Sequence, residues 1–258
     1  MEFINTIPYP LIAVSIFTFG LVIGSFANVC IYRLPKKESV IFPVSHCTTC
    51  SAPVRPFDNI PVISYLKLGG KCRDCKEGIS VIYPIIEAIT ALLLLAGFLK
   101  FGVTFDFLIY AVVAPTLVII TAIDIEHQII PDVITLPGIV LGLAAGSFTI
   151  GYIDSFLGFL IGGGLFYLLA VLSNGGMGGG DIKYIAAAGA LVGWQKVLLI
   201  IFIGAFLGSF VGLFQIAVQK KSRKSLIPFG PFLAAATLIT LFYGNLLIKL
   251  YIENLASY

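Results

Sequence analysis

Charge is scarce in this sequence. Only 11% of the 258 residues are charged, against about 25% in ordinary globular chains, while 59% are hydrophobic. This scarcity excludes an ordinary soluble domain and indicates a chain that lies mostly in lipid. Because one span takes about 20 apolar residues, eight spans would use roughly 160 positions and leave about 100 for loops and one small module. A large soluble catalytic domain is therefore excluded.

The chain also lacks a strong surplus of either charge, and it has little histidine. The 16 Lys and Arg residues against 13 Asp and Glu residues give a net charge of +3, which is too slight to propose nucleic acid as a partner. The two histidines, His46 and His127, belong to no H-E-x-x-H motif, and no G-x-S-x-G motif occurs. Metalloprotease and serine hydrolase interpretations are therefore disfavoured.

The apolar runs predict an all-α polytopic membrane protein with about eight transmembrane helices. The runs cover approximately residues 11–31, 82–99, 107–123, 134–148, 156–172, 184–192, 197–218 and 226–250. The sixth run is short and the fourth contains Pro137, so either could be a broken or partly buried segment, and seven spans remain an alternative. No basic region precedes the first run, and we expect a retained anchor rather than a cleaved signal peptide.

The distribution of lysine and arginine predicts the orientation, because these residues favour the cytoplasmic side of a membrane. They gather between the first two runs and between the last two, at Arg33, Lys36, Lys37, Arg55, Lys67, Lys71, Arg73, Lys76, Lys220, Lys221, Arg223 and Lys224. With eight spans these two loops share one face, and both termini lie on the other. The loops 124–132 and 173–181 then also lie on the cytoplasmic side.

Residues 33–80 form the only long polar stretch, and they hold two C-x-x-C pairs, Cys47 with Cys50 and Cys72 with Cys75. Such pairs present two thiolates to one tetrahedral ion, so four cysteines predict a closed, structural Zn²⁺ site. The metal would supply folding energy that so small a module cannot obtain from a core. Disulfide pairing is the alternative, disfavoured in a reducing compartment. The fifth cysteine, Cys30, is expected to be a small buried hydrophobe.

Two aspartates next to apolar runs are candidates for catalysis. Asp124 closes the third run, and Asp181 opens the sixth after three glycines, so both are expected at the same face. Two carboxylates in one site cannot both ionise cheaply; one stays protonated while the other activates water, as in aspartic proteases. Asp181 could instead cap a helix, and Asp132 is more simply a helix-start residue. Glu126 is expected to face solvent, and Glu87 to snorkel or to pair with a cation.

These motifs carry a resemblance to a known family. The segment Gly178-Gly179-Gly180-Asp181 fits the G-x-G-D signature of membrane aspartyl proteases, and residues 124–132 resemble the first-aspartate motif of bacterial type IV prepilin peptidases. The N-terminal half resembles the part of that family associated with N-methylation. The matching segments there are residues 24–28, 32–35 and 59–61, the two cysteine pairs, and Tyr83-Pro84 with Glu87.

The resemblance implies a bifunctional enzyme of the bacterial inner membrane. It would cut the basic leader from prepilins and pseudopilins on the cytoplasmic side with Asp124 and Asp181, and then methylate the new amino terminus with S-adenosylmethionine. Residues 1–32 would form the first transmembrane helix, residues 33–80 the zinc-binding, methyltransferase-associated module, and residues 81–258 the peptidase domain. Membrane lipid would surround the helices. A proton-coupled transporter and a non-catalytic pilus assembly scaffold are the alternative functions.

Overall fold

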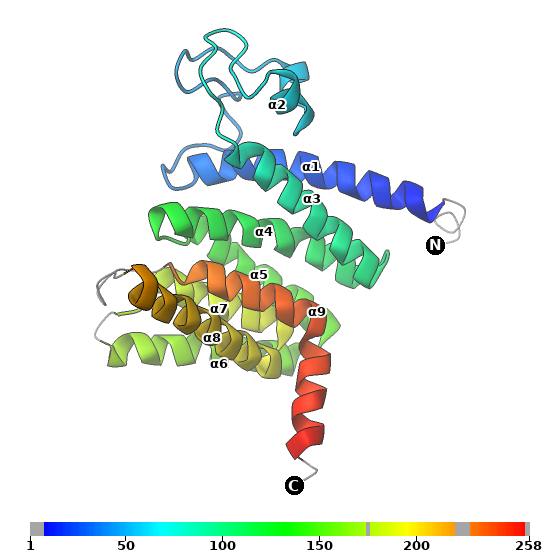
Figure 1. The fold of residues 1–258 in the computed structure, drawn as a ribbon. Helices are drawn as coiled ribbons and strands as arrows, with labels where there is room; N and C mark the ends of the chain where they lie inside the picture. The colour runs from blue at the N-terminus through cyan, green and yellow to red at the C-terminus, as the bar shows by residue number, and fades with distance from the viewer. Residues whose placement is uncertain (1–7, 174–175, 220–227, 256–258) are drawn as a thin grey trace. The chain divides into compact units, whose positions relative to one another are not determined.

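The computed structural model describes residues 8–173, 176–219 and 228–255, and this part of the chain is helical without any strand (Figure 1). The elements in chain order are α1 (Tyr9–Arg33), η2 (Pro56–Asp58), α2 (Ile63–Lys67), α3 (Ile82–Phe101), α4 (Phe105–His127), α5 (Asp132–Thr149), α6 (Tyr152–Leu172), α7 (Gly179–Val192), α8 (Trp194–Gln219) and α9 (Gly230–Leu255). The predicted all-α class is confirmed. The predicted basic loop at 220–224 lies outside the described residues.

Among the described residues, seven helices are long and apolar enough to cross a membrane: α1, α3, α4, α5, α6, α8 and α9. The protein is therefore a multi-pass membrane protein. The sixth predicted run falls in α7, whose 14 residues reach about 21 Å at 1.5 Å per residue, short of the roughly 30 Å hydrocarbon core. The fourth run is not broken, because α5 continues through Pro137.

The chain divides into two compact units, Met1–Ile119 and Ile120–Tyr258. In the first unit, α1 packs directly on α3. A Cβ at Gly20 would lie 2.6 Å from the Cα of Ala91, and one at Gly24 would lie 2.6 Å from the Cα of Glu87. Since neither position has room for a side chain, the two helix backbones touch. One turn further along α1, the side-chain amide of Asn28 donates to the carbonyl of Tyr83 at 3.1 Å.

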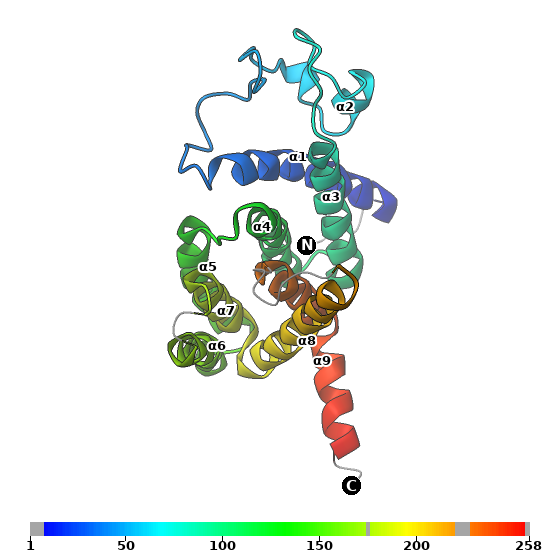
Figure 2. The same cartoon turned by 60° about the vertical axis from the view of Figure 1, so that its left-hand side comes forward.

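In the second unit, α7 is enclosed by α5, α6 and α8 (Figure 2). Its central residues from Tyr184 to Ala186 are buried. Gly162 and Gly163 of α6 face this helix, because added Cβ atoms there would meet the carbonyl of Ile185 and the Cβ of Ala186. Protein covers the short helix, which is how a membrane protein accommodates a segment that is too short to face lipid along its length.

Candidate functional site

Asp124 lies near the end of α4, where the helix continues past the apolar run to His127. Its side chain is buried, with 6% of the residue exposed. The carboxylate accepts the backbone N–H of Gly230 at 2.8 Å, and Gly230 is the first residue of α9. The free N–H groups at a helix start stabilise negative charge. The start of α9 is therefore a built-in partner for an ionised Asp124.

Asp181 is the third residue of α7 and is half-buried. Its carboxylate accepts a hydrogen bond from the backbone of Gly178, and it lies close enough to Asp124 for the charges of the two side chains to interact. The helix has no side-chain cap, because its N-cap residue is Gly178. Asp181 is therefore not an N-cap. Burial and the nearby charge of Asp124 raise the pKa of its carboxyl group to about 6.

The glycines before Asp181 have different surroundings. A Cβ at Gly178 would lie 3.1 Å from Oδ2 of Asp181, and a Cβ at Gly180 would lie 2.9 Å from Cβ and 3.2 Å from the carbonyl oxygen of Ile130. Gly179, between them, has open space. The two glycines that the G-x-G-D pattern specifies are thus the two that touch neighbours, and the variable position is the open one.

The segments that carry the two aspartates also meet through other residues. Ile130, six residues after Asp124, is buried against Gly180, the residue before Asp181. Lys183 of α7 bonds to Asp132 at the start of α5 at 2.6 Å. The end of α4, the connection to α5 and the start of α7 therefore lie together.

The other polar candidates near this site have different surroundings. Glu126 and His127 are exposed, as expected for Glu126. Asp132 begins α5 but makes no side-chain cap hydrogen bond; its exposed carboxylate pairs with Lys183 instead. The arrangement thus brings Asp124 and Asp181 together and leaves the remaining acids outside the pair. A close pair of carboxylates can share one proton, polarise a carbonyl and activate water without a metal.

Gly230 is the member of this site that sequence reasoning missed. The segment Phe229-Gly230-Pro231 precedes an apolar run, and a proline at the first turn is a recognised helix-start signal. That signal predicts where α9 begins. It does not predict that the start of α9 faces Asp124, which lies 106 residues earlier.

The cysteine module in the first unit consists of two similar turns. In the first turn, the N–H of Cys47 donates to the carbonyl of Ala52, and the N–H of Ser51 donates to the carbonyl of Cys47. In the second turn, the N–H of Cys72 donates to the carbonyl of Glu77, and the N–H of Lys76 donates to the carbonyl of Cys72. Isolated bridges His46 to Pro53 and Lys71 to Gly78 close the two turns. Ser51 and Lys76, each directly after the second cysteine, have φ of 58° and 63°.

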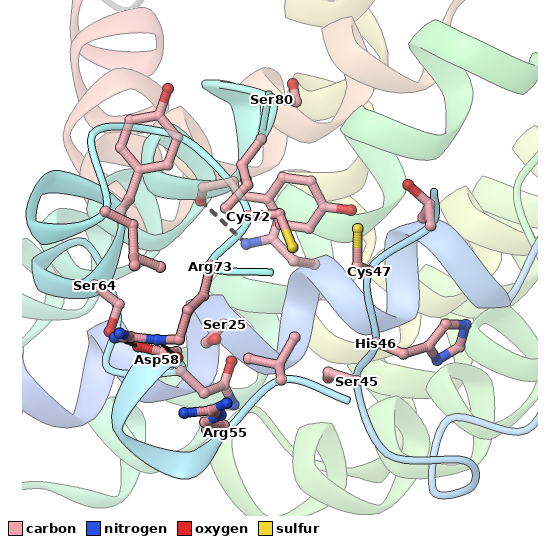
Figure 3. Close-up of a pocket in the computed structure, with 18 of the residues that line it drawn as sticks. Ser25, Ser45, His46, Cys47, Arg55, Asp58, Ser64, Cys72, Arg73 and Ser80 are labelled. Carbon is pink, nitrogen blue, oxygen red and sulfur yellow. Dashed lines mark hydrogen bonds and ion pairs between the residues drawn. The ribbon is translucent and has the colours of Figure 1, made fainter. Parts of the chain in front are cut away.

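The two turns bring the four cysteines together, with all four sulfurs within 4.8 Å of one another. The sulfurs of Cys47 and Cys72 point toward each other (Figure 3), and those of Cys47 and Cys75 are 3.8 Å apart. A tetrahedral site with Zn–S bonds of about 2.3 Å needs sulfur separations of about 3.8 Å. The cluster can therefore hold a metal ion, and its geometry fits Zn²⁺.

Electrostatics act differently on the cysteines of the module: against a backbone hydrogen bond from Glu77, burial and the side chains of the other three cysteines raise the pKa of Cys75 to about 12. Backbone N–H groups of Cys50 and Thr49 lower the pKa of Cys47 to about 6, so the module offers a thiolate at neutral pH. Beside it, two hydrogen bonds from the Arg73 guanidinium hold the pKa of Asp58 below its usual value. The Asp58 to Arg73 pair closes one side of the module (Figure 3). Cys30 is buried in α1, away from the cluster, as predicted.

A cavity of about 460 Å³ lies between the module and the adjoining ends of α1 and α3. Asn59 and Glu87, which matched sequence motifs without an assigned role, both line it. Glu87 does not snorkel, and it pairs with no cation of the residues that the structure describes. It is buried, and its Oε2 accepts the backbone N–H of Val62 at 2.7 Å.

Comparisons with known proteins match both units. Residues 18–101 match the bacterial peptidase A24 N-terminal domain, and residues 111–213 match the type IV leader peptidase family. Proteins named prepilin leader peptidase/N-methyltransferase from Pseudomonas aeruginosa, Legionella pneumophila and Bacillus subtilis are 34%, 33% and 31% identical to the chain. The matches cover 91%, 91% and 92% of this chain and 91%, 92% and 97% of those proteins. No solved structure matches.

The four clustered cysteines lie inside the first matched region, and both paired aspartates lie inside the second. The resemblance inferred from short motifs therefore extends over nearly the whole chain. The chain belongs to the type IV leader peptidase family.

Proposed function

We propose that this protein is a prepilin leader peptidase and N-methyltransferase. It removes the basic leader of prepilins and pseudopilins by means of Asp124 and Asp181, and it methylates the new amino terminus with S-adenosylmethionine. The observation that carries the peptidase is the pair of interacting carboxylates, one of them bonded to the N–H of Gly230. Family membership supports the same function, and nothing in the comparisons supports a transporter or a scaffold.

The surroundings of the pair support different roles for its two members. Asp124 accepts the N–H of Gly230 at a helix start, so we assign it the negative charge and the activation of the attacking water. Asp181 then carries the shared proton and donates it to the carbonyl oxygen of the scissile bond. Attack forms a tetrahedral intermediate. As the carbon–nitrogen bond breaks, the proton that Asp124 took from the water passes to the leaving amine. A hydroxyl of the intermediate returns a proton to Asp181, which restores the pair.

We further propose that the aspartates face the cytoplasm of a bacterial cell from its inner membrane. Seven basic residues between α1 and α3, together with Arg33 at the end of α1, support this orientation. Between Asp124 and Asp181 the chain crosses the membrane once in α5 and crosses back in α6, so both aspartates lie on the same face of the membrane. The basic module lies on that face if α3 and α4 likewise leave and return.

The four-cysteine cluster would hold one structural Zn²⁺. A closed shell of four sulfurs leaves no position for water or substrate, so the metal would fold the module and take no part in cleavage. This division supports residues 33–80 as a separate module beside the transmembrane part.

The test incubates the purified full-length protein with a prepilin, with and without S-adenosylmethionine, and follows substrate mass. Loss of the leader reports the peptidase, and a gain of one methyl group reports the transferase. Asp124→Asn and Asp181→Asn, each close in size to the native residue, should each lower cleavage by roughly a thousandfold or more. Retained cleavage in either folded variant contradicts the pair assignment.

A further inference from the structure

The cavity beside the cysteine module has the size and the polarity of a ligand site. Its volume of about 460 Å³ lies within the range of roughly 300–1,000 Å³ that is usual for small-molecule pockets. Residues from α1, from the start of α3 and from the module all line it. All of them belong to the first unit, whereas both aspartates of the pair belong to the second.

One wall of the cavity holds a buried carboxylate without a positively charged partner. Glu87 is 7% exposed. Its partners are the backbone N–H of Val62 and the side chain of Ser25, and among the described residues no Lys or Arg lies within 4.0 Å of it. Burying a carboxylate without a cation is costly. Because Glu87 lines a cavity despite this unfavourable free energy of burial, we expect the cavity to receive a positively charged group of a ligand.

The backbone that meets Glu87 is strained. Val62 has φ of 61° and ψ of −50°, a region that β-branched residues rarely occupy. In this conformation its N–H points at Oε2 of Glu87. Residues with strained backbone conformations are found often at functional sites, where the surrounding structure keeps them in that conformation. The strain at Val62 fixes one oxygen of Glu87 and leaves the other with acceptor capacity.

A second wall holds a buried cation without an acidic partner. Arg33, the last residue of α1, is 5% exposed and lines the cavity. Its guanidinium donates to the carbonyls of Ser39 at 2.9 Å and Pro43 at 2.6 Å. No carboxylate of the described residues lies within 4.0 Å. Because a guanidinium has five N–H donors, three remain for an anionic group.

The two charged groups come from different elements of the cavity wall, Glu87 from α3 and Arg33 from the end of α1. Gly24, which touches the backbone of Glu87, precedes Arg33 by nine residues, which is about 13 Å along a helix. By contrast, Arg55 and Arg73, which also line the cavity, already pair with Asp74 and Asp58. Among the described residues that line the cavity, Arg33 and Glu87 are therefore the charged groups that are buried without an ion-pair partner, whereas Glu77 is exposed.

We propose that this cavity is the methyl-transfer site, with Arg33 binding the carboxylate of S-adenosylmethionine and Glu87 receiving the amino terminus of the cleaved peptide. The inference rests on the N-methyltransferase part of the proposed function. It gives separate roles to Arg33 and Glu87, which the sequence motifs contain without assigning them a role. The cysteines themselves are unsuited to this role, because four-sulfur coordination leaves no open position.

The proposed chemistry is a substitution at the methyl carbon. The peptide's amino terminus arrives as an ammonium group, and Glu87 takes one proton from it, which frees the nitrogen lone pair. The nitrogen then forms a bond to the methyl carbon as the carbon–sulfur bond breaks. The electron pair of that bond stays on sulfur, so the sulfonium becomes a neutral thioether and the positive charge moves to the methylated nitrogen. Arg33 binds the carboxylate of S-adenosylmethionine and takes no part in bond making.

The experiment separates binding from transfer in the purified full-length protein. Calorimetry with S-adenosylhomocysteine, the unreactive product, measures affinity, and substrate mass measures methylation at saturating donor. Arg33→Gln should weaken binding about tenfold or more, because it removes charged hydrogen bonds. Glu87→Gln should keep the affinity within about threefold and lower methylation about a hundredfold or more. Arg55→Gln, at an exposed arginine of the same cavity, is the matched control.

Leader cleavage and zinc content of each preparation report folding. If Arg33→Gln does not fold, Arg33→Lys decides, because it keeps the charge and loses the two-pronged geometry. S-adenosylhomocysteine should then raise the melting temperature of the wild type and not of this variant. Wild-type affinity in the folded Arg33 variant, or normal methylation by Glu87→Gln, overturns the inference. A wild type that neither binds the donor nor methylates contradicts the proposed transferase itself.

Discussion

The backbone N–H of Gly230 donates a hydrogen bond to Oδ2 of Asp124 across 2.8 Å, which joins the start of α9 to the end of α4. The contact is tight as well as polar. A Cβ on Gly230 would lie 2.8 Å from that oxygen and 3.1 Å from the carboxyl carbon. Asp124 can therefore keep its position only while residue 230 has no side chain.

Gly230→Ala should displace the Asp124 carboxylate and lower leader cleavage by about tenfold or more, since misplacement of a reacting group by an ångström can cost a hundredfold. The backbone donor remains, so the loss reports position and not a missing hydrogen bond. Cleavage rates at saturating prepilin measure the effect. Gly164→Ala, in α6 with open space around it, is the control. Equal rates for both variants would show that the contact does not position Asp124.

The glycines before Asp181 give a second prediction. Gly180→Ala places a methyl group against Ile130, including its backbone, and such overpacking costs about 1–3 kcal/mol. We expect a lower melting temperature and a loss of cleavage, because the strain falls next to Asp181. Gly179→Ala meets open space and should change either measurement little. A Gly179 variant as impaired as the Gly180 variant would contradict this explanation of the G-x-G-D pattern.

Hydropathy predicted most of the fold and drew attention to both aspartates among the few acids near apolar runs, because the cost of burying charge in lipid makes such acids conspicuous. It predicted the end of the third run at Ile123, whereas α4 continues through His127. The extra turn exposes Ile125, Glu126 and His127 and buries Asp124, a tertiary effect that a local pattern does not contain. The same holds for Gly230 beside Asp124 and for Val62 beside Glu87, since both contacts join distant segments.

Removal of the metal provides a third prediction. Cys47→Ser should lower the zinc content from about one ion per chain to a small fraction, because a structural site depends on all of its ligands. Elemental analysis of the purified protein measures the ion. Methylation should fall with it, while leader cleavage should persist, since the aspartate pair belongs to the other unit. Cys30→Ala, at the buried cysteine of α1, is the control, and full zinc content in Cys47→Ser would contradict the four-sulfur site.

Asp132 provides the last prediction, because it is an acid beside the active pair that is not assigned to catalysis. Its bond to Lys183 is short, at 2.6 Å, but the two side chains are 57% and 38% exposed. Ion pairs that exposed contribute about 0–1 kcal/mol. Asp132→Asn should therefore change the melting temperature slightly and cleavage less than about threefold, in the same assay in which Asp124→Asn loses nearly all activity. If Asp132→Asn were as inactive as Asp124→Asn, the reaction would need a third acid, and a dyad of Asp124 and Asp181 would be an incomplete description of the site.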